Sequence, residues 1–226
     1  MINEKPKTLP GDRSLIKGDP PAPVIGVLAL QGDFDAHLAA TREAGGDPRP
    51  VRTPAQIRQI DALILPGGES TTIGKLMARY GLDTAIREAH ADGMPIFGTC
   101  AGMILLARHI ARGEMRGGQN TLGLMDIAVE RNAFGRQVDS FEADIDAPDI
   151  APERPLRGVF IRAPIVTEIG PDVEPLATID GRTVLVRQRN LLAAAFHPEL
   201  TGDHRVHRFF LSMVASPEPN RGASSP

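Results

Sequence analysis

The stretch PIFGTCAGMILLARHI, residues 95–110, decides the fold that we expect for this chain. It opens with an apolar run, 95–98, that is too short for a helix and is typical of a strand buried on both faces. It then passes through GTCAG (98–102) into an apolar segment, 103–110, for which we expect a helix. Strand, glycine-flanked turn and helix in direct succession indicate a parallel sheet covered by helices.

The residues before this stretch repeat the same alternation. VIGVLAL (24–30) and ALIL (62–65) predict two more buried strands. Helical patterns lie between the strands, at 36–46, 71–81 and 82–93, and the first of them closes on glycine. Because strand–helix–strand units join parallel strands, these segments extend the same sheet.

The second half of the chain has a different pattern. It predicts mainly strands, followed by a closing helix at 206–215. The expected strands are 125–132, 139–145, 158–166, 182–188 and 191–197. We therefore expect an α/β fold of the flavodoxin-like kind, with a three-layer, mostly parallel sheet flanked by helices and some antiparallel strands added late.

Both ends of the chain lack hydrophobic periodicity and are rich in proline, glycine and polar residues. Segments of this composition bury too little apolar surface to fold. We expect flexible tails at 1–22 and 216–226 around one domain, 23–215.

The composition excludes several classes of protein. The 226 residues are 42% hydrophobic and 23% charged with a net charge of −3, which argues against a general nucleic-acid binder. No apolar run is long enough for a membrane span, and the first residues lack the core of a signal peptide. A single cysteine allows no internal disulfide or cysteine-based zinc site. We expect a cytoplasmic protein with no metal and no cofactor.

Cys100 has the sequence context of a nucleophile. The pattern Gly98-x-Cys100-x-Gly102 between a strand and a helix has the form of a nucleophile elbow, with cysteine in place of serine. The start of the following helix favours a thiolate, and the amide of Ala101 is in position to bind an oxyanion. The alternative is a buried structural cysteine, the usual fate of a free thiol, but the context favours the nucleophile.

Among six histidines, His197 is the best candidate for the base. It ends an apolar run and precedes Pro198, which disfavours helix at the residue before it, so we expect an extended backbone there. In an extended segment residues two apart face the same side, which would let Glu199 orient the imidazole. The alternative is a His-Pro turn with a solvated glutamate.

The other histidines have plainer interpretations. His37, His90 and His109 lie in helical patterns among charged residues, and we expect them on solvated helix faces. His204 and His207 have a spacing that can hold a metal, but an ordinary helix start is the favoured interpretation.

The glycine-rich loop that follows the second strand is not a phosphate-binding loop. That motif requires glycine at position 69 and serine or threonine at 76, where Glu69 and Leu76 stand. We expect the loop's free amides to complete an oxyanion hole, with Ser70 or Thr71 capping the next helix. A plain Gly-Gly turn with an N-cap is the alternative.

Taken together, these motifs carry a family resemblance. GTCAG with a later HPE resembles the triad-type (class I) glutamine amidotransferases. Five further stretches narrow it to the PdxT/SNO family, the glutaminase subunits of pyridoxal 5′-phosphate synthase, over about 24–215. These are GVLALQG (26–32), LPGGESTT (65–72), VERNAFGRQVDSFE (129–142), VFIRAP (159–164) and FHPELT (196–201).

The resemblance implies a catalytic triad. Cys100 would attack the carboxamide of L-glutamine, His197 would protonate the leaving ammonia, and Glu199 would orient His197. Gly68 and Ala101 would form the oxyanion hole.

It also implies where the substrate binds. Glu69 and Ser70, with Gly68, would line the glutamine site, and Gln31 would lie near the oxyanion hole and the partner interface. The two ends of the substrate's amino-acid group would be held by Arg131, Ile161 and Arg162. An arginine suits carboxylate capture because its guanidinium binds both oxygens.

Finally, the resemblance implies a partner. Family members dock on a barrel-shaped synthase subunit in a hetero-oligomer, which takes up the ammonia to build pyridoxal 5′-phosphate, and hydrolysis is expected to be weak until docking. Two alternatives remain: another cysteine hydrolase on the same scaffold, such as a γ-glutamyl hydrolase or protease-like relative, and a catalytically silent interaction subunit.

Overall fold

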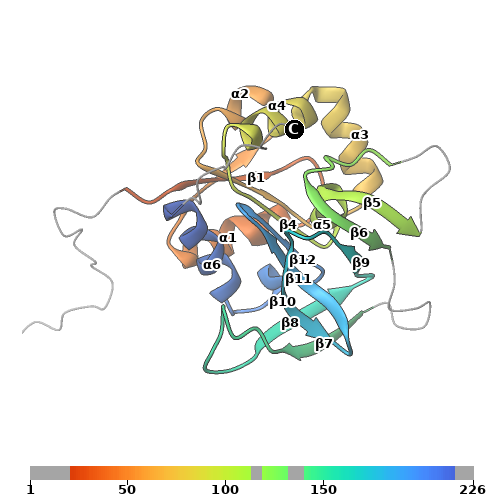
Figure 1. Cartoon of the computed structure of the whole chain (residues 1–226). Helices are drawn as coiled ribbons and strands as arrows, with labels where there is room; N and C mark the ends of the chain where they lie inside the picture. Colours follow the sequence, from red (N-terminus) through yellow and green to blue (C-terminus); the bar gives the residue numbers. More distant parts are fainter. Residues whose placement is uncertain (1–20, 113–118, 132–139, 217–226) are drawn as a thin grey trace, which may run out of the picture.

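A computed structural model describes residues 21–112, 119–131 and 140–216, which form a sheet between two layers of helices (Figure 1). The expected α/β fold is confirmed: the first half supplies parallel strands, and the second half adds antiparallel pairs around β11 and β9. In sheet order the strands are β2 (Asp47–Val51), β1 (Val24–Leu28), β3 (Ala62–Leu65), β4 (Ile96–Thr99), β12 (Leu191–Ala194), β11 (Arg182–Gln188), β9 (Ile165–Ile169), β6 (Met125–Glu130) and β5 (Ala107–Arg112), with β10 (Glu174–Ile179) paired to β11.

Helices cover both faces of the sheet. On one face α1 (Phe34–Ala44) packs against α6 (Arg205–Ala215). The other face carries α2 (Pro54–Ile57), α3 (Ser70–Tyr80), α4 (Leu82–Ala91) and α5 (Ala101–Leu106) (Figure 1). Within the described ranges, every helix is too short or too polar to cross a membrane.

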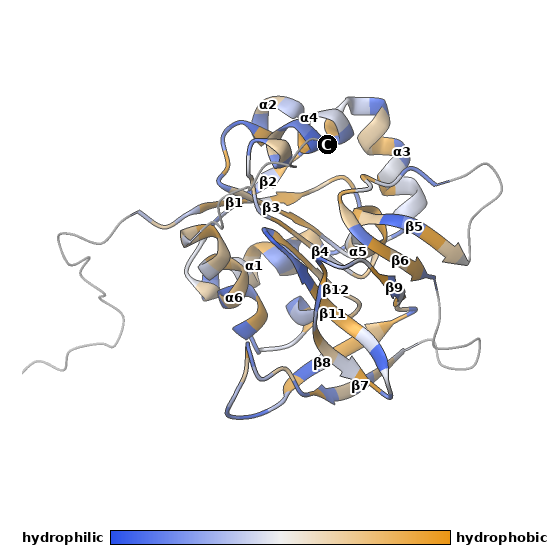
Figure 2. Ribbon diagram, viewed as in Figure 1, coloured by the Kyte–Doolittle hydropathy of each residue, from blue (hydrophilic) through white to orange (hydrophobic). Residues whose placement is uncertain are grey.

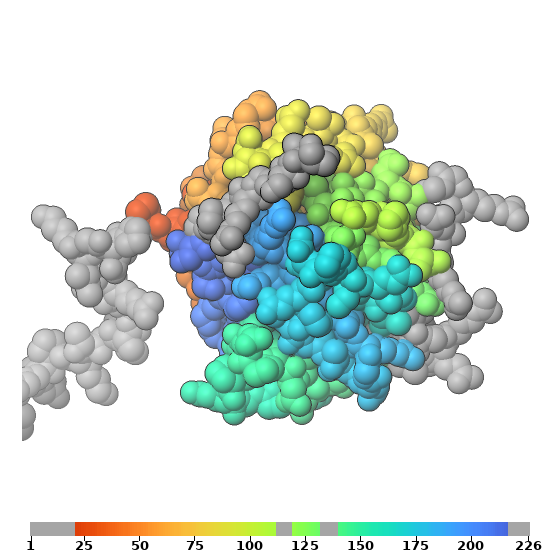
Figure 3. Space-filling view, viewed as in Figure 1, coloured from red at the N-terminus to blue at the C-terminus, as the bar shows by residue number. Residues whose placement is uncertain are grey.

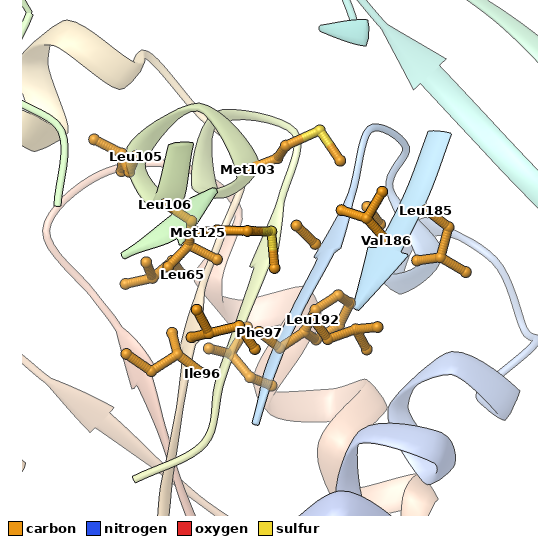
Figure 4. Packing of buried hydrophobic residues seen from close by; sticks show 14 of the residues in the cluster. Leu65, Ile96, Phe97, Met103, Leu105, Leu106, Met125, Leu185, Val186 and Leu192 are labelled. Atoms are coloured by element: carbon orange, nitrogen blue, oxygen red, sulfur yellow. The ribbon is translucent and has the colours of Figure 1, made fainter. Parts of the chain in front are cut away.

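The central strands are mainly apolar, as the hydropathy colouring shows (Figure 2). Every residue of β3, β4 and β12 is buried, which is why these strands read as continuous apolar runs. Leu65 of β3 lies beside Leu106 of α5 on one face of the sheet, whereas Phe97 of β4 lies next to Leu192 of β12 and packs against Phe210 of α6 on the other face (Figure 4). These strands and α5 are buried on either side of the loop that joins β4 to α5.

A two-stranded hairpin, β7 (Ser140–Ile145) and β8 (Leu156–Ile161), lies at the edge of the molecule opposite α2 and α4 (Figure 3). Its strand β8 approaches the end of β12, where the backbone N–H of His197 donates to the carbonyl of Val159 at 2.8 Å. A short 3-10 helix, η1 (Pro198–Leu200), follows. The hairpin is therefore hydrogen-bonded to the segment that carries the HPE motif.

Three predicted elements differ from the observed ones by more than a shift of one or two residues at their ends. The expected helix at 103–110 ends at Leu106, and the next residues form β5 beside β6. The expected strand 158–166 is two strands, because Arg162 has a φ of 45° and Pro164 follows. The strand expected to run to His197 ends at Ala194.

The sequence patterns missed β2 and β10. β2 reads DPRPV, and two prolines in five residues do not predict a strand. The prolines are tolerated because β2 lies at the edge of the sheet. The N–H of Asp47 points toward β1 and donates to Pro23, so the backbone nitrogens of the alternate residues Pro48 and Pro50 point away from β1, where no hydrogen bond is lost. The tails expected at 1–22 and 216–226 lie almost wholly outside the described residues.

Candidate active site

The loops after β1, β3 and β4 meet at the carboxyl edge of the sheet, where ligands bind in such folds. Three glycines allow them to approach. A Cβ atom on Gly32 would collide with the carbonyl oxygen of Gly67, one on Gly67 with the His197 ring, and one on Gly102 with the carbonyl oxygen of Leu65. The site is therefore assembled by close backbone packing.

Cys100 lies in a strained turn between β4 and α5. Its φ of 48° and ψ of −102° are rare for a residue with a side chain, and only 7% of the residue is exposed. The turn is possible because Gly98 and Gly102 touch: a Cβ on Gly98 would lie 2.6 Å from the Gly102 carbonyl carbon. The thiol lies 3.7 Å from the carbonyl oxygen of Ile161. This geometry is that of a nucleophile elbow.

His197 and Glu199 are joined by a short hydrogen bond. Nδ1 of the imidazole lies 2.8 Å from Oε1 of the carboxylate, and each residue is only 7% exposed. The contact forms at the start of η1, so the expected extended backbone is not what brings the two side chains together. Because the carboxylate can only accept, Nδ1 carries the proton and Nε2 is left for the thiol.

The electrostatics of the pair favour charged groups. Burial alone would lower the pKa of His197, but hydrogen bonds and charge interactions with Cys100 and Glu199 outweigh it and raise the pKa to about 10. Burial would raise the pKa of Glu199, yet interactions with His37 and His197 hold it well below its usual range. Imidazolium and carboxylate therefore coexist in a nearly dry site.

Glu69, and not Ser70 or Thr71, caps α3. Its side chain accepts from the N–H groups of Thr71 at 3.0 Å and Thr72 at 2.7 Å. Burial opposes the charge, but the hydrogen bond from the Thr72 hydroxyl at 2.6 Å and these backbone bonds lower the pKa of Glu69 to about 2. The expected cap was wrong because the longer glutamate side chain reaches the same amides. Ser70 is buried, and its hydroxyl makes no hydrogen bond within the described part of the chain.

The other predicted loop residues lie around Glu69. The Gln31 side chain accepts a hydrogen bond from the backbone N–H of Glu69 at 2.8 Å, so it braces the loop. Gly68 has a φ of 148°, and a Cβ there would lie 2.7 Å from Oε1 of Gln31. Ala101, at the start of α5, is buried beside Cys100.

Arg131 reaches the same loop from the end of β6. Its Nη2 lies 3.5 Å from Oε1 of Glu69, and its Nη1 donates to Gln119 Oε1 at 2.9 Å. The motifs gave no signal for Gln119. Ile161 contributes its carbonyl group beside the Cys100 thiol, whereas the Arg162 side chain is exposed and makes no ion pair with any described residue. The structure thus brings Arg131 to Glu69 but leaves Arg162 apart.

His37 was wrongly expected on a solvated helix face, and His207, which does lie at the start of α6 as expected, is also buried. His37 is fully buried and His207 is 1% exposed. Nε2 of His37 lies 3.3 Å from Oε2 of Glu199, so this histidine contacts the site. A signal existed: His37 shares a helix face with Ala40 and Thr41 at i+3 and i+4, and all three are buried. Across the ranges 21–112, 119–131 and 140–216, no three acidic, histidine or cysteine residues cluster as metal ligands would.

Similarity to known proteins agrees with this geometry. Residues 27–216 match the SNO glutamine amidotransferase family. A pyridoxal 5'-phosphate synthase subunit PdxT from Streptomyces coelicolor is 55% identical over 203 residues, covering 90% of this chain and 98% of the relative. One of the same name from Desulforudis audaxviator is 57% identical over 190 residues, covering 84% and 98%.

Solved structures give the same result. One described as a crystal structure of glutamine amidotransferase has a TM-score of 0.79 and 47% identity, covering 84% of this chain and 98% of that one. A Trypanosoma brucei CTPS glutaminase domain shares the fold, with a TM-score of 0.60, 12% identity and coverage of 87% and 95%. The family match over most of the chain, with more than half of the residues identical to long-matched relatives, leads to one conclusion. The chain belongs to the SNO glutamine amidotransferase family.

Proposed function

We propose that this chain hydrolyses L-glutamine to L-glutamate and ammonia, and that it passes the ammonia to a synthase subunit that makes pyridoxal 5′-phosphate. One observation carries the proposal: Cys100 occupies a strained, positive-φ turn, its interaction with His197 helps to raise the pKa of that histidine, and Nδ1 of the same imidazole is held by Glu199 at 2.8 Å. The names of the PdxT relatives support the assignment to that synthase.

In the first step Cys100 passes its thiol proton to Nε2 of His197, and the sulfur attacks the side-chain carboxamide carbon. A carbon–sulfur bond forms, and the carbonyl electron pair moves to the oxygen. As the intermediate collapses, the carbon–nitrogen bond breaks and Nε2 of His197 gives its proton to the leaving nitrogen, which departs as ammonia. The raised pKa of His197 ensures that this proton is present at neutral pH. A glutamyl thioester remains.

In the second step water replaces the sulfur. His197, now neutral, takes a proton from the attacking water, and the carbon–sulfur bond breaks to return the thiolate and release glutamate. Glu199 accepts from Nδ1 throughout, which holds the imidazole in one tautomer and stabilises its charged form. The triad thus returns to its starting state.

Developing negative charge on the carboxamide oxygen requires donors. The backbone amides of Gly68 and Ala101 are the proposed oxyanion hole, since Gly68 lies in the closely packed loop after β3 and Ala101 follows Cys100 at the start of α5. Gln31 acts at one remove: its hydrogen bond to the Glu69 amide sets the Gly68 backbone.

The amino-acid end of glutamine is proposed to bind between the β3 and β6 loops. Arg131 and Glu69 supply opposite charges there, suited to the α-carboxylate and the α-ammonium group. Ser70 offers a buried hydroxyl without a described partner, and the Ile161 carbonyl lies beside the thiol. Arg162 is proposed at the rim of the site, where its side chain is exposed.

The proposed partner is the barrel-shaped synthase subunit, in a cytoplasmic hetero-oligomer. Ammonia is largely protonated in neutral water and is then no nucleophile, so direct transfer between subunits preserves its reactivity. The rival readings, a partner-free cysteine hydrolase and a silent binding subunit, make different predictions for activity.

The test measures glutamate release from glutamine by the purified chain alone, with its cognate synthase subunit, and with Cys100→Ala as the control. We expect slow turnover alone, a clear rise on mixing, and none in the mutant. Full activity without the partner would favour the partner-free hydrolase. No hydrolysis in a confirmed complex would leave a binding subunit.

A further inference from the structure

A buried polar cluster lies directly behind the proposed triad, and the reaction scheme above does not use it. It consists of His37 from α1, Thr99 from the end of β4 and His207 from α6, all at most 1% exposed. Nε2 of His37 lies 3.0 Å from Thr99 Oγ1 and 3.3 Å from Oε2 of Glu199, and its Nδ1 lies 3.1 Å from Nε2 of His207. Two helices that pack on one face of the sheet therefore converge on the triad carboxylate.

The protons in this cluster can be assigned from the neighbours. The ionised carboxylate of Glu199 accepts only, so the ring nitrogen that faces it at 3.3 Å must carry a hydrogen, since a lone pair there would repel the oxygen. His37 is thus protonated on Nε2, and that N–H faces both Thr99 and Glu199. Its Nδ1 is then the acceptor of the ring when His37 is neutral.

His207 supplies the matching donor. Its Nδ1 is buried and makes no hydrogen bond to any described residue, so a proton there would be left without an acceptor. The proton belongs on Nε2, which faces His37. Burial and the neighbouring His37 lower the pKa of His207 to about 3, which agrees with a neutral ring carrying one proton. A directed chain results, from His207 to His37 to Glu199.

Glu199 depends on this chain because its two oxygens have separate partners. Oε1 accepts from His197, whereas Oε2 makes no hydrogen bond of regular geometry within the described ranges, and its ion-pair contact is Nε2 of His37 at 3.3 Å. A buried carboxylate oxygen without a donor is strongly disfavoured. Packing holds the donor in place, since the His37 and His207 rings both lie edge-on to Phe97.

We propose that His37 is a positioning residue of the active site, which holds Glu199 ionised and aimed at His197, and that His207 fixes the tautomer of His37 that does so. The arrangement is a relay of four side chains behind Cys100, and of these four only His197 meets the substrate. The inference rests on the proposed glutaminase triad, and it adds two residues to it.

The first test compares His37→Leu with His37→Gln in the complex with the synthase subunit. Leucine removes the N–H, whereas the glutamine amide can place an N–H near the position of Nε2. We expect kcat of His37→Leu to fall about tenfold to a hundredfold, the range seen when supporting hydrogen bonds of an active site are removed, with KM for glutamine little changed. His37→Gln should recover most of the loss. His90→Leu, a half-buried histidine on α4, is the matched control.

A second measurement needs no glutaminase activity. Cys100 is the only cysteine in the chain, so alkylation by iodoacetamide at neutral pH reports its thiolate directly. We expect slower alkylation in His37→Leu and in His207→Phe, which keeps an aromatic ring but removes the donor to His37. Circular dichroism melts establish that each variant is folded, and if His37→Leu is not, the glutamine and His207 variants carry the test.

The outcomes separate the two proposals. Wild-type protein without glutaminase activity would remove the proposed function, while the alkylation series would still test the relay. An active wild type with equal kcat and equal alkylation in His37→Leu and His90→Leu would overturn the relay. So would a loss in His37→Leu that glutamine does not recover, because ring packing rather than the N–H would then matter.

Discussion

Gly67 lies directly against the imidazole of His197, so that a Cβ atom on this glycine would collide with Cε1 and come within 3.0 Å of Nδ1. The contact joins the loop after β3 to the histidine after β12. His197 has little freedom to move, because its backbone N–H is hydrogen-bonded to Val159 and its ring to Glu199. The loop and the ring therefore cannot both stay in place if the glycine gains a side chain.

Gly67→Ala should displace the His197 ring while leaving the fold intact. A displacement of about 1 Å can cost about a hundredfold in rate, so we expect a loss of kcat of that order. The measurement is glutamate release in the complex. Gly202→Ala is the control, since no atom lies within 4 Å of a Cβ built there. Equal activity of the two variants would show that the ring has room to move.

Glu199→Gln should reduce kcat strongly while the protein remains folded. The amide can donate to Nδ1 and so stabilise the wrong tautomer of His197, and the corresponding change in serine proteases costs about 10⁴-fold. We expect a loss between a hundredfold and about that value, measured at saturating glutamine. Glu168→Gln, on an exposed position of β9, is the control. Retention of more than half of the activity would remove Glu199 from the triad.

The free energy of unfolding should depend on pH through His197. Its pKa in the folded protein is raised from 6.5 to about 10. A raised pKa means that the folded state binds the proton more tightly, so the stabilisation is complete below pH 6.5 and is lost as the pH rises toward 10. Urea unfolding of wild type and His197→Gln at pH 6, 8 and 9.5 measures it. We expect the stability advantage of the wild type to shrink with rising pH, and a constant difference would contradict the assignment.

Arg131→Lys should raise KM for glutamine with a smaller effect on kcat. The guanidinium contacts Glu69 and Gln119 at once, and an ammonium group cannot reproduce that fork. We expect KM to rise about tenfold, which corresponds to about 1.4 kcal/mol of lost binding free energy. The exposed Arg58→Lys serves as the control. An unchanged KM would place the α-carboxylate elsewhere.

Arg205→Lys should destabilise the protein without changing the chemistry. Arg205 donates to the carbonyl groups of Arg154 and Pro155 at 2.8 Å each, and it pairs with Asp203. These bonds tie the segment before β8 to the start of α6. Since hydrogen bonds to charged groups contribute about 1.5–3 kcal/mol, we expect a loss of about 2 kcal/mol in urea unfolding. The exposed Arg208→Lys should lose almost nothing.

Local pattern predicted the strands and helices of the first half, because β1, β3 and β4 are buried on both faces and the helices between them are amphipathic. It was wrong where the secondary structure of a segment depends on pairing with a strand that is distant in the sequence. Residues 107–112 have an apolar and basic pattern that suits a helix, yet they form β5 because β6 offers an edge to pair with. The prolines of β2 hid a strand that exists only at an edge.

The site was predictable where residues adjacent in sequence form it. The turn at Cys100 forms within GTCAG, and the contact between His197 and Glu199 forms within HPE. His37 and His207 could not be predicted in the same way, since they are separated by 170 residues and meet only when α1 and α6 pack together. Gln119 likewise contacts Arg131, which lies 12 residues further along the chain, and no local sequence pattern predicts this contact.

The prolines of β2 have one more consequence. Because Pro48 and Pro50 face outward, the outer border of this strand lacks two of the amide hydrogens that an added strand would need. Such borders resist aggregation and amyloid-like stacking. A further strand, from another copy or another protein, would therefore form fewer backbone hydrogen bonds with this edge of the sheet. Assembly through sheet extension is disfavoured along β2, which leaves contacts between side chains as the means of association on this flank.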